Sequence, residues 1–219
     1  MSWAEVFKIN NNMKKTINEQ IRDTICSPIR VITSNTTYTP EKTGMYKVIC
    51  VGAGGNSDGF YGVNTTLGSG GGGGVAIKIM KLLSTQNYNV TVGSTASFGS
   101  TLTATAGGVG SSNNNGGTGG AGGTASGGDF NFTGETGSGI WYGKTSNSAK
   151  GGNVGTFITE LSRQAISHEG YSAFNIDLVY GMGILTYGGG APGAVHGSGV
   201  LERTGQPGAV IIIPLEMEE

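Results

Sequence analysis

Two stretches of the sequence begin like nucleotide-binding motifs, but neither has the full spacing. Val48 to Gly54 reads Val-Ile-Cys-Val-Gly-Ala-Gly, the start of a dinucleotide fingerprint, yet the third glycine would fall at Ser57 and no helical pattern follows. Gly143-Lys144-Thr145 is typical of the end of a phosphate-binding loop, yet Ser138 stands where its first glycine belongs. The sequence therefore predicts neither kind of nucleotide site.

The histidines and carboxylates suggest a metal or acid–base site at one place in the chain. His168 is next to Glu169, with Glu160 and Asp177 nearby in the sequence, and His196 is the other histidine. The alternative is that these histidines and carboxylates are ordinary polar residues on the surface, and the sequence favours the surface interpretation. We assign no metal, cofactor or catalytic residue here.

Paired carboxylates that cleave glycans need a fixed separation across the scissile bond. Acidic residues after Gly44 are scattered, and Asp58, Asp129 and Glu135 fall in glycine-rich loops, which offer little rigid support. The sequence therefore predicts that the protein is not an enzyme.

Aromatic residues in loops are the best candidates for binding, because they offer large, rigid contact areas. The alternative is that they fill small side-chain cores. The candidates for receptor binding are Phe60, Tyr61, Trp141, Tyr142, Tyr171 and Phe174.

Composition limits what can position these side chains. The chain has 43 glycines in 219 residues, well above the usual share, and all of them fall from Gly44 onward. Charged residues make up 12% and the formal net charge is −1, so nothing favours nucleic acid or an anionic membrane as a partner. No apolar run approaches the roughly 20 residues of a membrane span, and no signal peptide is expected. Cys26 and Cys50 could pair, but the sequence favours two reduced thiols.

The glycine-free beginning of the chain predicts a short α-helix, residues 1–27. Ser2 and Glu5 have the spacing of a capping box, and Pro28 prevents the helix from continuing much further. One helix face is apolar, which predicts an attachment or oligomerisation surface, with packing on the chain's own domain as the alternative. This apolar stripe consists of Val6, Ile9, Met13, Ile17 and Ile21.

The remainder predicts a mainly β fold: a connector over residues 28–44 and a glycine-rich β domain over residues 45–219. Within the connector, Pro28 to Tyr38 is either extended chain or a strand, because the run from Ile29 to Thr33 is β-prone. Tyr88, Val90 and Val92 alternate with polar residues, as in a half-buried strand. The final apolar run, Ala209 to Ile213, is expected to end at a sheet edge because Pro214 follows. Other strands are expected at Met45 to Val51, Val75 to Met80 and Phe98 to Thr105.

Between these strands, residues 70–74 and 107–128 are dominated by glycine. They are either flexible linkers or extended segments with three residues per turn that pack backbone against backbone. Recurrence inside a strand-bearing domain favours packing, and hydrogen bonds between neighbouring backbones would then replace a side-chain core.

Several of these stretches resemble the glycine-rich domain of phage tail fibres and tail-tip adhesins. The resemblance rests on the segments starting at Tyr46, Tyr88, Ser97 and Pro207, in that order, and covers residues 38 to 214. The opening residues, Ser2-Trp-Ala-Glu-Val6 and the Ile9 to Lys15 run, are similar to the starts of clostridial prophage virion proteins.

The resemblance implies a β-sandwich-like domain with polyglycine-II-type segments, whose variable loops at one end bind a host surface protein or glycan. It also implies a homotrimer located in the virion and made in the host cytoplasm. Residues 156–187 are poor in glycine for that pattern and are either an inserted binding lobe or a scaffold element.

Three functions remain open: a receptor-binding tail adhesin attached to the particle by its helix, a non-adhesive virion component, and a secreted structural protein. The second class includes head fibres, decoration proteins and baseplate parts. The third would need an export route.

Overall fold

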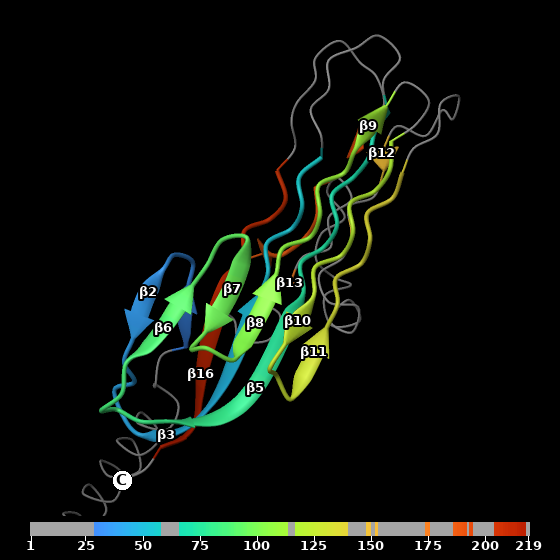
Figure 1. Cartoon of the computed structure of the whole chain (residues 1–219). Helices are drawn as coiled ribbons and strands as arrows, with labels where there is room; N and C mark the ends of the chain where they lie inside the picture. Colours follow the sequence, from blue (N-terminus) through green and yellow to red (C-terminus); the bar gives the residue numbers. More distant parts are fainter. Residues whose placement is uncertain are drawn as a thin grey trace, which may run out of the picture.

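The protein is mainly β, as predicted, and consists of two antiparallel sheets and a bundle of glycine-rich segments (Figure 1). The computed structural model describes residues 29–57, 66–113, 117–139, 148–149, 152, 174–175, 186–191, 193–194 and 204–217. No helix occurs among these residues. The helix predicted for residues 1–27, with its apolar stripe, lies outside them.

Each of the two main sheets has five strands. Sheet A has the order β1 (Arg30–Ile32), β16 (Ala209–Met217), β3 (Gly44–Val51), β5 (Val75–Leu82) and β11 (Phe130–Phe132). Sheet B has the order β10 (Ala125–Ser126), β8 (Leu102–Thr105), β7 (Thr95–Phe98), β6 (Tyr88–Thr91) and β2 (Thr36–Tyr38).

Three further pairs of two-residue strands lie outside the main sheets. They are β4 (Thr66–Leu67) with β9 (Ser112–Asn113), β12 (Ser148–Ala149) with β15 (Gly193–Ala194), and β13 (Phe174–Asn175) with β14 (Thr186–Tyr187).

The main hydrophobic core lies between the two sheets. The period-two alternation of β6 turns Tyr88 and Val90 inward, where Tyr88 stacks on Phe98 with ring centroids 5.2 Å apart. Sheet A contributes side chains such as Val48 and Ile212 to the same cluster. Each buried side chain of this size contributes about 1.5–3 kcal/mol.

Sheet A is also covered on its second face, which explains the unbroken apolar run in β16. Val210 and Ile212 face sheet B, whereas Ile211 belongs to a second cluster with Ile49 and Tyr187. A strand buried on both faces has no solvent side and shows no alternation.

The last strand extends further than the sequence predicts. β16 continues past Ile213 to Met217, with a register shift between Pro214 and Glu216. Its pairing with β1 covers only residues 210–212, so at Pro214 the strand has β3 as its one paired neighbour. Proline tolerates that position because one side of the strand needs no backbone donor there.

The predicted connector contributes a strand to each sheet. β1 pairs with β16 in sheet A, and β2 pairs with β6 in sheet B. Within residues 156–187, the described part is the β13–β14 pair.

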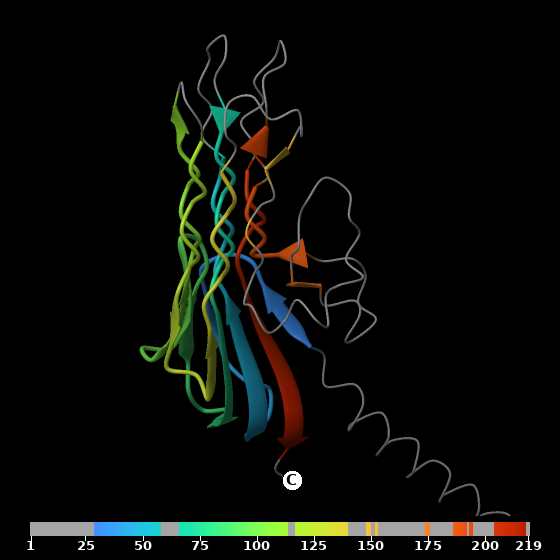
Figure 2. The same ribbon diagram turned by 90° about the vertical axis from the view of Figure 1, so that its right-hand side faces the viewer.

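The glycine-rich segments run side by side away from the sheets and make the molecule elongated, which both Figure 1 and Figure 2 show. We call them the glycine bundle, and the end farthest from the sheets its distal end. Each segment is continuous in sequence with a strand; for example, β3 leads into residues 52–57, and residues 68–74 lead into β5. The bundle comprises residues 52–57, 68–74, 106–111, 117–124, 133–139, 188–191 and 204–208, with Gly152 beside them.

Candidate functional site

The centre of the glycine bundle is the segment 68–74, whose backbone N–H groups donate to three neighbours in rotation. Ser69 and Gly72 donate to the carbonyls of Ser138 and Glu135, at 3.1 and 2.9 Å. The next N–H groups along, those of Gly70 and Gly73, donate to Ala191 and Gly188, at 2.8 and 2.7 Å. Those of Gly71 and Gly74 donate to Gly108 and Thr105, at 3.0 and 3.1 Å.

The carbonyls of this central segment accept hydrogen bonds with the same repeat. Those of Ser69 and Gly72 accept from the N–H groups of Gly120 and Gly123, those of Gly71 and Gly74 from Gly55 and Gly52, and that of Gly70 from Gly152. Residues three apart therefore bond to the same neighbouring segment. The six neighbours of the central segment are residues 52–55, 105–108, 120–123, 135–138 and 188–191, and Gly152. A repeat of three residues per turn is that of the extended polyproline II helix, which has no internal hydrogen bonds and leaves every backbone group for a neighbour.

This packing requires glycine at the inward positions. A Cβ atom added to Gly71 would lie 2.0 Å from the carbonyl oxygen of Ala121, and one added to Gly73 would lie 2.0 Å from that of Gly52. The described parts of residues 70–74 and 107–124 are therefore not flexible linkers. They pack backbone against backbone.

In the segment 117–124, residues with side chains occupy every third position, on the outside of the bundle. Thr118, Ala121 and Thr124 are exposed and are separated by pairs of glycines. This local Gly-Gly-X spacing is present in the sequence, although no strict Gly-X-Y repeat runs through the whole chain. It is the signal that could have identified the inward and outward positions in advance.

The distal end of the bundle carries four of the two-residue strands. β4 pairs with β9, β12 pairs with β15, and β15 also lies against β4. The resulting order is β9, β4, β15, β12, and Figure 1 shows β9 and β12 together at this end. Four connections of the chain begin or end at these strands: residues 58–65, 114–116, 140–147 and 195–203.

Five of the six aromatic candidates lie outside the described residues: Phe60, Tyr61, Trp141, Tyr142 and Tyr171. The first two belong to the connection that enters β4, and the next two to the connection that enters β12. Their role in binding stays a prediction.

Phe174 is placed by its backbone, away from the distal strands. It is in β13, where it pairs with Tyr187 of β14. The Tyr187 side chain is 5% exposed and packs on the second face of sheet A. β13 therefore lies where sheet A meets the bundle, and a receptor contact by Phe174 would be separate from one at the distal end.

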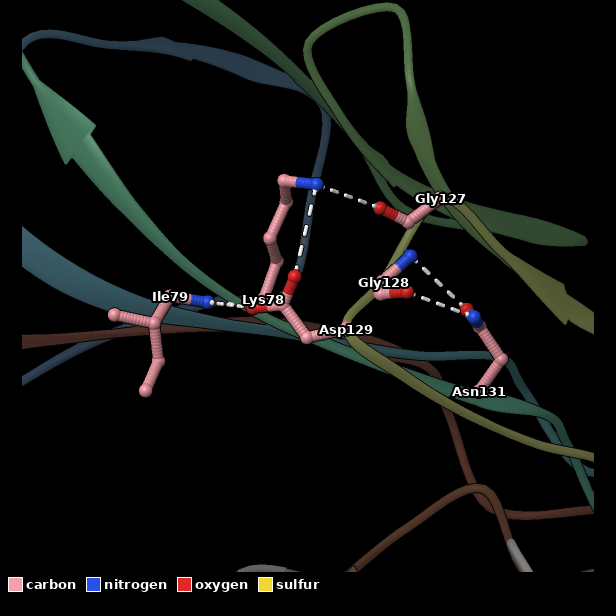
Figure 3. Close-up of polar contacts among 6 residues, drawn as sticks. All are labelled: Lys78, Ile79, Gly127, Gly128, Asp129 and Asn131. Atoms are coloured by element: carbon pink, nitrogen blue, oxygen red, sulfur yellow. Dashed lines mark hydrogen bonds and ion pairs between the residues drawn. The ribbon is translucent and has the colours of Figure 1, made fainter.

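The described polar cluster around Asp129 stabilises the turn between β10 and β11 (Figure 3). Asp129 accepts a hydrogen bond from the Ile79 N–H at 2.8 Å and lies 3.9 Å from the Lys78 ammonium, which donates to the Gly127 carbonyl. Asn131 accepts from the Gly128 N–H and donates to its carbonyl. These contacts engage Asp129 in holding the backbone, which is a structural role.

The thiol of Cys50 is free and fully buried, as the sequence favoured, whereas Cys26 lies outside the described residues. Burial raises the pKa of Cys50 to about 12, so the thiol is neutral at physiological pH. Burial likewise raises the pKa of Tyr38 to about 12.

Among the residues that the structure describes, no three His, Cys, Asp or Glu side chains come together as a metal site would require. Within the same residues, no helix has the length and hydropathy of a membrane span. His168, Glu169, Glu160, Asp177 and His196 lie outside the described part of the chain.

No protein-family model matches the chain, and a search of curated proteins finds no match.

Proposed function

We propose that the chain is a structural protein of a phage or a phage-tail-like particle, of the tail-fibre or adhesin type. In this proposal the glycine segments form a polyglycine-II-type lattice, and the loops at its distal end bind a receptor on the host surface. The N-terminal helix attaches the protein to the particle, and the assembled form is a homotrimer.

One observation carries the proposal: the hydrogen-bonded bundle separates β1, where the described fold begins, from the distal strands. β1 pairs antiparallel with β16, so that Arg30 lies opposite Ile212 and Ile32 opposite Val210. Ala209 follows directly on the bundle segment 204–208, so β1 runs toward the bundle and the chain enters from the far side. The described fold therefore begins at the end away from the bundle, and the distal strands lie at the opposite end, which suits a protein held at one end and binding at the other.

A rigid support is also what a binding surface built on loops needs. Loops positioned by a scaffold carry binding residues in many proteins, because variation in a loop leaves the scaffold unchanged. Here the scaffold depends on main-chain hydrogen bonds and inward glycines, so the sequences of the connections can vary without disturbing a side-chain core.

The test is binding of the labelled full-length protein to intact bacterial cells of a panel of strains. Saturable binding restricted to some strains is expected. A folded protein that binds none of the strains, including those the particle infects, would contradict the adhesin function and favour a non-adhesive virion component.

A second measurement addresses attachment. Replacing Val6, Met13 and Ile17 together by Asp places three charges on the apolar stripe and is expected to abolish incorporation into particles. Cell binding by the isolated variant should remain. Normal incorporation of this variant would contradict the attachment role of the stripe.

A further inference from the structure

Sheet A is open along part of its outer edge. β3 pairs with all eight residues of β5, whereas the edge strand β11 pairs only with residues 75–77. Within the described part of the chain, no strand pairs with the outer side of residues 78–82. An unpaired strand edge presents a row of backbone N–H and carbonyl groups, to which a strand of another chain can add.

The Asp129 side chain occupies the first backbone donor on this open edge. Ile77 is opposite Phe130 at the end of the β11 pairing. The backbone groups of residues two apart point to the same side of a strand, so the next outward N–H is that of Ile79. This N–H donates to Oδ2 of Asp129 at 2.8 Å (Figure 3). A carboxylate therefore stands where the carbonyl of an added strand would accept.

The turn before β11 also stops that strand from covering the edge. In a longer β11, the register would bring Gly128 opposite Ile79. The N–H and carbonyl of Gly128 are instead bonded to the Asn131 side chain, at 3.0 and 2.9 Å. The backbone of Gly128 is thereby withdrawn from the ladder, which leaves the Ile79 N–H to the carboxylate.

The side chains beside the open edge would favour association if the edge were free. Ile79 is 48% exposed and Phe130 is 59% exposed, and the register places both on the second face of sheet A. Exposed apolar edges are typical sites of edge-to-edge pairing. The ion pair of Asp129 with Lys78, at 3.9 Å, has two partly exposed partners and adds little stability of its own. Closing the edge explains a carboxylate here better than this ion pair does.

The sequence of the open edge suits pairing with an identical strand. A two-fold axis at Met80 would set Ile79 of one copy against Lys81 of the other, and Lys78 against Leu82. No two lysines would then be directly opposite, so like charges would not oppose the pairing.

We infer that the outer edge of β5, residues 78–82, is a pairing surface for a second copy of this chain, and that Asp129 keeps it closed. Without the carboxylate, two copies would join their A sheets edge to edge through antiparallel β5 strands. This surface is separate from the distal strands and from receptor binding.

The first test is the oligomeric mass of two variants at position 129. Asp129→Ala is expected to give a light-scattering mass that rises with concentration toward twice the wild-type value. Asp129→Asn is the matched control, because its amide oxygen still accepts the Ile79 N–H, and it should keep the wild-type mass. A folded Asp129→Ala protein with the wild-type mass at every concentration would overturn the inference, as would equal association of the two variants.

A second change blocks the same edge in another way. Ile79→Pro removes the outward N–H, and proline at an edge position prevents strand addition. Combined with Asp129→Ala, it is expected to restore the wild-type mass. Association that persists in the folded double variant would place the contact elsewhere and contradict pairing through β5.

Amide hydrogen exchange tests the closed edge without any variant. In the wild-type protein, the Ile79 N–H is expected to be protected although it has no strand partner on that side. In dilute Asp129→Ala, its protection should fall by at least about tenfold, as for a lost hydrogen bond to a charged group. Rapid exchange of Ile79 in the wild-type protein would show that Asp129 does not close the edge and would overturn the inference.

Discussion

At single positions, the architecture depends on the absence of a side chain. The inward glycines of the bundle approach a neighbouring carbonyl so closely that even a methyl group has no room. For Gly73, a Cβ atom would lie 2.0 Å from the Gly52 oxygen, whereas for Gly93 nothing lies within 4 Å. Neither residue has a positive φ, so steric contact is what separates the two sites.

Gly73→Ala is therefore expected to lower the free energy of unfolding by more than about 4 kcal/mol, because backbone, and not a flexible side chain, occupies the space. Gly93→Ala is the control and should be neutral or stabilise by about 0.4–1 kcal/mol, since alanine restricts the unfolded chain. Thermal unfolding followed by circular dichroism measures both. Similar melting temperatures for the two variants would show that the bundle can spread to admit a methyl group.

Among the strands, stability comes from side chains in the ordinary way. The two sheets share a core in which Phe98 stacks on Tyr88 and is 1% exposed. Phe130, in the edge strand β11, is instead 59% exposed on the second face of sheet A. The same residue type thus occupies two environments that differ mainly in burial.

Phe98→Ala is expected to lower the free energy of unfolding by about 3–5 kcal/mol, because the variant loses buried apolar surface and leaves a cavity. Phe130→Ala should change stability by no more than about 0.5 kcal/mol, as for exposed positions in general. Urea denaturation of the two variants provides the comparison. A large loss for Phe130→Ala would indicate that its exposed face is covered in solution.

For the molecule as a whole, sheets and bundle form one continuous structure. The chain passes from β3 into residues 52–57 and from residues 68–74 into β5, while β3 and β5 pair along eight residues. Separating the bundle would pull apart segments that begin in the sheets. Unfolding is therefore expected to be cooperative across both parts.

Amide hydrogen exchange tests this cooperativity. The N–H groups of Gly70 to Gly73 donate to backbone carbonyls at the centre of the bundle and should exchange as slowly as those in the middle of β3 and β5. Heating should give one calorimetric transition. Rapid exchange at these glycines, with the sheets still protected, would show that the bundle opens independently.

Much of the local structure could be predicted because its cause is local. The alternation at Tyr88 and Val90 predicts a strand with one buried face, and four of the five strands expected from the sequence are present, with shifted ends. The fifth prediction, one strand over Phe98 to Thr105, is wrong: β7 ends at Phe98, the chain turns at Gly99, which has a positive φ, and β8 begins at Leu102. The glycine-free beginning predicts that the glycine-rich β domain starts near Gly44, where β3 begins. The linker and packed alternatives for the glycine stretches could only be weighed, since composition is compatible with both.

Tertiary structure alone decided which segments are neighbours. Ser69 bonds to Ser138 and Gly70 to Ala191, and glycine has no side chain whose pattern could reveal such partners in the sequence. The same holds for β1 and β2: the sequence left Pro28 to Tyr38 as a connector or a strand, and their partners β16 and β6 are far along the chain. The sequence by itself determined where side chains are few and where they alternate. The backbone contacts that replace a side-chain core depend on the position of the whole chain in space, because every residue carries the same N–H and carbonyl groups.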